Sequence, residues 1–160
     1  MGYGAAGVDL FTGLLDTPAA YTGQGTKIAK VKSAETGLEF TAFSNDAALV
    51  FIIKDADSTG LKGFLQIPFG CEITGYSILA DVAGDIVVDI WKDVFANFPP
   101  DVADTITAAA KPELSAAQAI FSTVLTGWTI AIAALDVLGF NIDSVTTITS
   151  ITITIFVTKT

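Results

Sequence analysis

The C-terminal residues 146–158 carry the pattern that most constrains the fold. From residue 151 every second position holds a large aliphatic residue, and threonine fills most of the positions between them. The aliphatic positions are Ile151, Ile153, Ile155 and Val157. Successive side chains of a β-strand point to opposite faces, so this period of two predicts a long strand with one buried and one polar face. Ile148 is out of phase with the series, which predicts a β-bulge near residues 149–150.

Shorter apolar runs bounded by polar turns precede this segment. They are residues 49–54, 61–67, 72–80, 85–91, 128–132 and 136–141. The turn at residues 55–60 predicts a hairpin between the first two runs, and residues 81–84 predict a second turn. The Ala-rich residues 115–121 predict a helical turn. Short strands at this regular spacing predict an all-β fold, an antiparallel β-sandwich.

The composition agrees with that fold and argues against several classes of partner. Hydrophobic residues make up 51% of the 160-residue chain and charged residues 16%, so a packed core is available. The formal net charge is −9, and such an acidic chain is expected to be repelled by nucleic acid and by anionic membranes. Residues 114–135 are uncharged and long enough to span a bilayer, but their serines, threonines and glutamine favour core structure.

The sequence lacks the usual means of catalysis and of transition-metal binding. It has no histidine, which is the most frequent general base and transition-metal ligand. Cys71 and the serines therefore have no recognisable base partner, and we interpret Cys71 as a buried inert thiol. Residues 55–60 imitate the start of a calcium loop, yet Gln66 stands where that loop requires glutamate, and a turn explains them better. We expect no enzyme activity, no metal and no cofactor.

One loop gathers carboxylates and aromatic residues close together in the sequence. Its candidate ligand-contacting residues are Trp91, Asp93, Phe95, Phe98 and Asp101. Paired carboxylates beside aromatic side chains occur in glycosidases, and the same groups suffice to bind a sugar without cleaving it. They are also expected where a strand ends in a loop above a core, with Trp91 and Phe98 capping the sandwich. We favour this structural interpretation over sugar binding, and sugar binding over catalysis.

The first 45 residues differ in character from the rest. Residues 1–13 are rich in glycine, and their sizeable apolar side chains are Tyr3, Val8, Leu10 and Phe11. Such a segment cannot bury itself and is expected to fold upon docking to another protein. Residues 14–45 offer two short strands, 27–32 and 38–43, with too little apolar side chain to fold alone. Association with copies of the same chain is the expected remedy.

Residues 14–40 also contain short motifs in a fixed order. They are Leu15-Asp16-Thr17-Pro18, Tyr21-Thr22-Gly23-Gln24-Gly25, Lys30-Val31 and Thr36-Gly37-Leu38-Glu39-Phe40. In this order and spacing the motifs resemble a module of bacteriophage fibre and tail proteins, which stands just ahead of a C-terminal head domain. The resemblance implies a virion component rather than an enzyme.

A second set of motifs runs from residue 63 to the C-terminus. They are Gly75-Tyr76-Ser77-Ile78-Leu79-Ala80-Asp81, Asp89-Ile90-Trp91-Lys92-Asp93, Asn97-Phe98-Pro99-Pro100, Ala103-Asp104-Thr105-Ile106, Lys111-Pro112-Glu113-Leu114-Ser115 and Phe140-Asn141-Ile142-Asp143-Ser144. These motifs resemble a jelly-roll head domain found at the ends of phage fibres. Leu135 departs from that family, which usually has glycine before the aspartate of this turn. The departure affects one turn of the expected jelly roll.

The two resemblances together imply a division of the chain into three parts. Residues 1–13 are expected to form an extended N-terminal arm that anchors the protein to another virion protein, of the capsid or the tail. Residues 14–45 are expected to form a short intertwined β stem of a homotrimer, and residues 46–160 the jelly-roll head. The residues expected in the trimer stem are Leu15, Pro18, Tyr21, Ile28, Val31, Leu38 and Phe40.

Two functions remain open at this stage. In the first, the chain is a short trimeric fibre or decoration protein on the virion. The capsid surface is favoured, because so short a stem suits a tail fibre poorly. In the second, it is a tail receptor-binding protein whose head recognises host surface glycans.

Overall fold

The computed structural model describes residues 27–31, 38–42 and 44–160. The chain divides into two compact units, Met1–Ser44 and Asn45–Thr160. The predicted arm, residues 1–13, lies outside the described residues. The division into arm, stem and head therefore stays a prediction.

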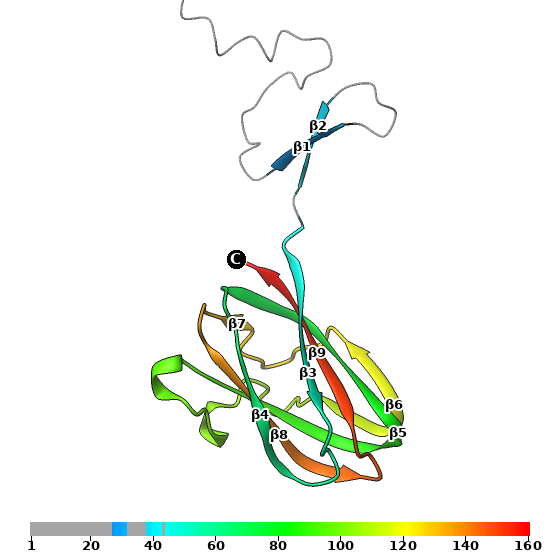
Figure 1. Cartoon of the computed structure of the whole chain (residues 1–160). Helices are drawn as coiled ribbons and strands as arrows, with labels where there is room; N and C mark the ends of the chain where they lie inside the picture. Colours follow the sequence, from blue (N-terminus) through cyan, green and yellow to red (C-terminus); the bar gives the residue numbers. More distant parts are fainter. Residues whose placement is uncertain (1–26, 32–37, 43) are drawn as a thin grey trace, which may run out of the picture. The chain divides into compact units, whose positions relative to one another are not determined.

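The first unit contains a two-stranded antiparallel sheet of β1 (Lys27–Val31) and β2 (Leu38–Ala42), drawn in blue in Figure 1. Ile28 lies opposite Thr41. Lys30 Nζ lies 3.3 Å from Glu39 Oε1 across the two strands. Both strands expected in the stem are present, and they pair with each other within one chain. Their intertwining with other copies stays a prediction.

The second unit is built almost entirely of antiparallel strands. They are β3 (Asp46–Ile53), β4 (Gly60–Gln66), β5 (Cys71–Asp93), β6 (Glu113–Ser122), β7 (Ala131–Ile132), β8 (Val137–Thr146) and β9 (Ile151–Lys159). The sheet order is β3-β9-β5-β8-β4, and β6 and β7 also pair with β5. Two short 3₁₀ helices, η1 (Phe95–Asn97) and η2 (Val102–Asp104), lie between β5 and β6. The predicted all-β, antiparallel class is confirmed, and the jelly-roll topology stays a prediction.

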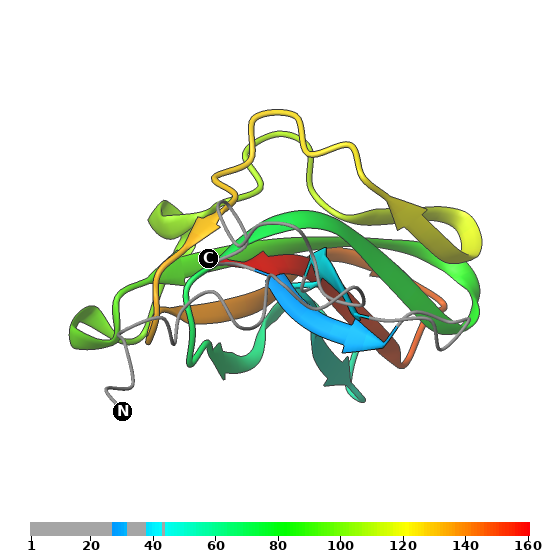
Figure 2. The same cartoon turned by 90° about the horizontal axis from the view of Figure 1, so that it is seen from above.

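The long strand β5 changes its partner halfway along. Residues 71–80 pair with β9 and residues 85–93 pair with β8, so β8 and β9 follow each other along β5. The sheet bends where the partner changes, and Figures 1 and 2 show it curled over on itself. Gly84 lies in this bend, where a Cβ would come within 2.5 Å of the Thr146 carbonyl oxygen. A side chain at this position is therefore incompatible with the close approach of the strands.

The core lies between the two halves of the curled sheet. Residues 151, 153, 155 and 157, which predicted the buried face of β9, are each at most 1% exposed, so this prediction is confirmed. The second half of β5 contributes Ile86, Val88 and Ile90 to the same core. The Phe51 ring of β3 stacks on the Phe140 ring of β8, with centroids 4.4 Å apart. This contact joins the two halves of the sheet directly.

Two predicted turns are wrong. Residues 55–60 do not close a hairpin, because β3 pairs with β9 and β4 pairs with β8. They carry the chain from one half of the sheet to the other. Residues 81–84 belong to β5. The Asp81 carboxylate accepts hydrogen bonds from Thr149 Oγ1 at 2.5 Å and from the backbone N–H groups of Thr149 and Ser150 at 3.2 Å. The polar residues of the bend thus hold neighbouring strands together instead of reversing the chain.

Three other local predictions are also wrong. Residues 115–121 form part of strand β6 rather than a helical turn, because pairing with β5 overrides the weak helical preference of alanine. The strand predicted from residue 128 begins only at Ala131. The expected bulge near residues 149–150 is instead the break between β8 and β9.

Candidate functional site

The predicted ligand loop begins with a buried tryptophan. Trp91, near the end of β5, is 9% exposed, and its indole N–H donates a hydrogen bond to Asp89 Oδ2 at 3.0 Å. The ring is therefore engaged within the protein rather than presented to a ligand.

The two carboxylates of the predicted site shape the loop. Asp93 Oδ1 accepts hydrogen bonds from the Val94 backbone N–H at 2.7 Å and from Asn97 Nδ2 at 3.2 Å. Asp101 Oδ1 accepts from the Ala103 backbone N–H at 2.8 Å, and this bond caps the start of η2. Such bonds satisfy the free N–H groups of a turn or helix end. Both aspartates are thus explained by loop structure.

The exposed part of the loop includes three large apolar side chains. Phe95 is 62% exposed, Phe98 is 51% exposed and Val102 is 69% exposed. Phe98 also packs edge-on against the Phe64 ring of β4, with centroids 4.7 Å apart. In Figure 1 this part of the chain projects from the end of the curled sheet. We call Phe95, Phe98 and Val102 the loop tip, and it offers aromatic faces to a binding partner.

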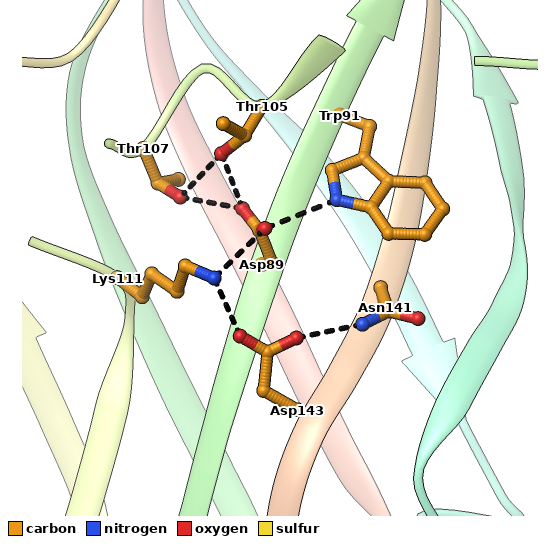
Figure 3. A network of polar contacts seen from close by, with 7 residues as sticks. All are labelled: Asp89, Trp91, Thr105, Thr107, Lys111, Asn141 and Asp143. Atoms are coloured by element: carbon orange, nitrogen blue, oxygen red, sulfur yellow. Dashed lines mark hydrogen bonds and ion pairs between the residues drawn. The ribbon is translucent and has the colours of Figure 1, made fainter. Parts of the chain in front are cut away.

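A buried polar network lies beside this loop, around Asp89 (Figure 3). Asp89 is 1% exposed and stands on the face of β5 opposite the core residues Val88 and Ile90. Its Oδ1 accepts hydrogen bonds from Thr105 Oγ1 at 2.6 Å and from Thr107 Oγ1 at 2.7 Å. The carboxylate therefore ties the segment after η2 to the middle of the sheet.

Lys111 extends the network to the neighbouring strand β8. Its Nζ lies 3.0 Å from Asp89 Oδ2 and donates a hydrogen bond to Asp143 Oδ2 at 2.5 Å. The other oxygen of Asp143 accepts a hydrogen bond from Asn141 Nδ2 at 2.7 Å. The ammonium thus bridges two carboxylates on adjacent strands, and Figure 3 shows the bridge.

The network keeps Asp89 and Lys111 ionised. Burial by itself raises the pKa of Asp89, but hydrogen bonds from Thr105, Thr107, Lys111 and Trp91 outweigh burial and hold the pKa below its ordinary value. The pKa of Lys111 is raised, chiefly by the hydrogen bond to Asp143 and with a contribution from Asp89, against the opposing effect of burial. An ionised carboxylate with both oxygens engaged does not serve as a general acid. The network is therefore best explained as a structural clamp.

Sequence reasoning did not find this clamp. The sequence presents Asp89 only as part of the motif Asp89-Ile90-Trp91-Lys92-Asp93, and Lys111 lies 22 positions further along the chain. One signal was available, because Asp89 interrupts a run of aliphatic residues and a buried charge requires a partner. The sequence does not show which lysine supplies that partner.

A second surface stands out because nothing in the described chain covers it. It consists of the outward side chains of β3, β9, β6 and the first half of β5, and we call it the bare face. Its most exposed large side chains are Val50 at 52%, Ile52 at 57%, Leu79 at 55% and Phe121 at 65%. Exposed apolar residues that lie together in this way mark interaction surfaces.

An open groove of about 460 Å³ lies at one end of the bare face. Phe121 and Phe156 line it, and their rings pack edge-on with centroids 5.4 Å apart. Asp46 and the threonines Thr74, Thr123 and Thr158 also line it. The groove is thus a mainly apolar depression with hydroxyl groups and one carboxylate at its border.

The stem residues are only partly described. Ile28 is 49% exposed, and Phe40 is half-buried. Val31 and Leu38 lie opposite each other in the pair β1–β2, but their side chains lie outside the described part. Leu15, Pro18 and Tyr21 lie outside the described residues altogether, as do the anchoring residues Tyr3, Val8, Leu10 and Phe11.

Within residues 27–31, 38–42 and 44–160, no group of three or more histidine, cysteine, aspartate or glutamate residues could hold a metal ion. Asp55, the first residue of the sequence that imitates a calcium loop, forms an ion pair instead: its Oδ2 lies 3.7 Å from Lys62 Nζ. In the same part of the chain, no helix is both long enough and apolar enough to cross a membrane.

Comparisons of the chain with protein-family models, with curated proteins and with solved structures gave no match.

Proposed function

We propose that the chain is a structural protein of a bacteriophage virion, displayed on the particle as a short trimeric fibre or decoration protein. The capsid surface is its favoured location. The ordered motifs of residues 14–40 and those of the second unit support the virion assignment through their resemblance to phage fibre proteins. The carboxylates of the ligand loop support a non-enzymatic role, because loop structure accounts for them.

One observation carries the trimer. The sheet β1–β2 has only two strands, and none of its described side chains is buried. An isolated two-stranded sheet is marginally stable in water. Ile28 alone leaves half of its side chain in solvent. Copies of the same strands, packed around a common axis, would cover such side chains and the open strand edges.

Particle labelling tests the location. Gold-labelled antibody against the protein should decorate the capsids of intact particles. Particles without label would contradict the virion assignment, and label confined to the tail would favour receptor binding. Deletion of residues 1–13 should leave a trimer that no longer adds to particles lacking the protein. Normal addition would place the anchor elsewhere.

The alternative function is receptor binding by a tail protein. The exposed loop tip favours it, because aromatic faces stack on sugar rings. The full chain should then bind glycans on an array. The variants Phe95→Ala and Phe98→Ala should each lose this binding. A parallel assay for sugars released from host polysaccharide separates binding from hydrolysis, and release lost on Asp93→Asn or Asp101→Asn would contradict the non-catalytic role.

A further inference from the structure

We propose that the bare face is the surface through which the heads of neighbouring copies of this chain meet. The inference rests on the trimer of the proposed function and names the surface that joins its heads.

The charge distribution favours another copy as the occupant. The chain carries a net charge of −9, so two copies repel each other wherever their carboxylates meet. The middle of the bare face has no charged residue. Its outward residues are Ala48, Val50, Ile52, Ser77, Leu79, Ala119, Phe121, Thr152, Thr154 and Phe156. A basic partner would instead select a surface rich in carboxylates.

The short link between the two units also keeps the second units of the copies close together. β2 ends at Ala42 and β3 starts at Asp46, so three residues join the two units. A fully extended link of this length reaches about 14 Å. If three copies of β2 surround one axis, each β3 must begin within that reach of the end of its own β2. The link therefore keeps the second units of the three copies close enough together for their sheets to meet.

The architecture of β3 points the same way. It is the last strand in the sheet order and pairs only with β9 among the described residues, so its outer edge is open. Val50 and Ile52 are its outward side chains, and both are more than half exposed. An open apolar edge invites pairing with further chains unless a partner covers it. Packing of the heads within the trimer would cover this edge and the groove beside Phe121 together.

Thiol labelling of the full chain tests the proposal. Ile52→Cys and Leu79→Cys place a thiol on the bare face, and Val102→Cys places one on the loop tip as a matched exposed control. Native Cys71 is 1% exposed, and burial raises the pKa of its thiol, so its background reaction with a maleimide is slow. In a trimer confirmed by sedimentation, Cys at 52 and 79 should react at least about tenfold more slowly than Cys at 102, because interface cores exclude solvent.

Each other outcome overturns the inference in a distinguishable way. A trimer in which all three thiols react equally would leave the trimer standing and the bare face free for another ligand. A monomer with reactive thiols would remove both the trimer and the interface. Protection in a monomer would show that the chain's own N-terminal residues cover the face, and deletion of residues 1–13 would then restore reactivity.

Discussion

The two halves of the curled sheet share strand β5 but differ in how far their outward side chains are exposed to solvent. In the second half of β5 the outward residues Asp89 and Trp91 are 1% and 9% exposed. Pro100 lies so close above β8 that a Cβ at Gly139 would approach its Cγ to 3.3 Å. In the first half, the outward residue Leu79 is 55% exposed. The described part of the chain covers one outer face with a loop and leaves the other face uncovered.

The difference shows what a charge and an apolar side chain each require. Asp89 can be buried because the loop brings two hydroxyl groups and an ammonium to it. No segment of the described chain covers Leu79 or Ile52. We expect another copy of the chain to cover them. Substitutions in the covered half should therefore lower the stability of the fold, and substitutions in the bare half should weaken association.

The largest effect is expected for Asp89→Ala in the covered half. Removing this carboxylate leaves the Trp91 indole N–H, two threonine hydroxyls and the Lys111 ammonium without their acceptor, at a cost of about 3 kcal/mol in unfolding free energy. Urea denaturation at fixed protein concentration measures it. Asp143→Ala is the matched control, because Asp143 is partly exposed, and it should cost about 1 kcal/mol or less. Equal losses for the two variants would contradict the clamp.

A smaller effect in a different assay is expected for Leu79→Asp in the bare half. This change adds three like charges to the proposed contact between heads and should weaken association by roughly 2 kcal/mol, or about 30-fold in the dissociation constant. Sedimentation over a dilution series measures it, and circular dichroism should show an unchanged fold. Val102→Asp, at a position 69% exposed on the loop tip, should leave the mass unchanged. Equal effects of both variants would contradict the contact.

Acid should loosen the bend that joins the two halves. Hydrogen bonds from Thr149 and, to a lesser extent, from Ser150 lower the pKa of Asp81 from its ordinary value of 3.8 to about 2. Because the pKa is lower in the folded state, the stabilisation is complete above about pH 4 and declines as the pH falls toward 2. Thermal melting of the wild type and of Asp81→Asn at several pH values measures this stabilisation. The variant should lose less stability than the wild type between pH 4 and pH 2. Identical pH profiles would contradict a role for this carboxylate.

The sequence predicted the parts of this fold that depend on local pattern. The aliphatic alternation of residues 151–157 was sufficient to identify β9 and its buried face. It could not predict that β5 continues through residues 81–84, because Asp81 and Gly84 have the chemistry of a turn and only their contacts with residues 146–150 make them a bend. Long-range pairing decided both that point and the failure of the hairpin at residues 55–60.

The candidate surfaces were harder to predict for the same reason. Trp91 and Phe98 are close in sequence and looked equivalent, yet one is buried against Asp89 and the other is half exposed. Leu79 and Phe121 each look like core residues when read alone. Their exposure appears only when the register of β5 and β6 places them on the outward side.

The smallest effect is expected at the loop tip. Phe95→Ala should change the unfolding free energy by no more than about 0.5 kcal/mol, because the side chain is 62% exposed. The same urea denaturation that measures Asp89→Ala provides the comparison. A loss as large as that of Asp89→Ala would mean that the tip is covered in the assembled protein.

Sedimentation equilibrium of the full-length wild-type chain tests the central claim most directly. The account predicts one species with three times the 16.6 kDa mass of the chain at micromolar concentration. A stable monomer at that concentration would contradict it, because both the two-stranded stem and the bare face would then stand in water without a partner.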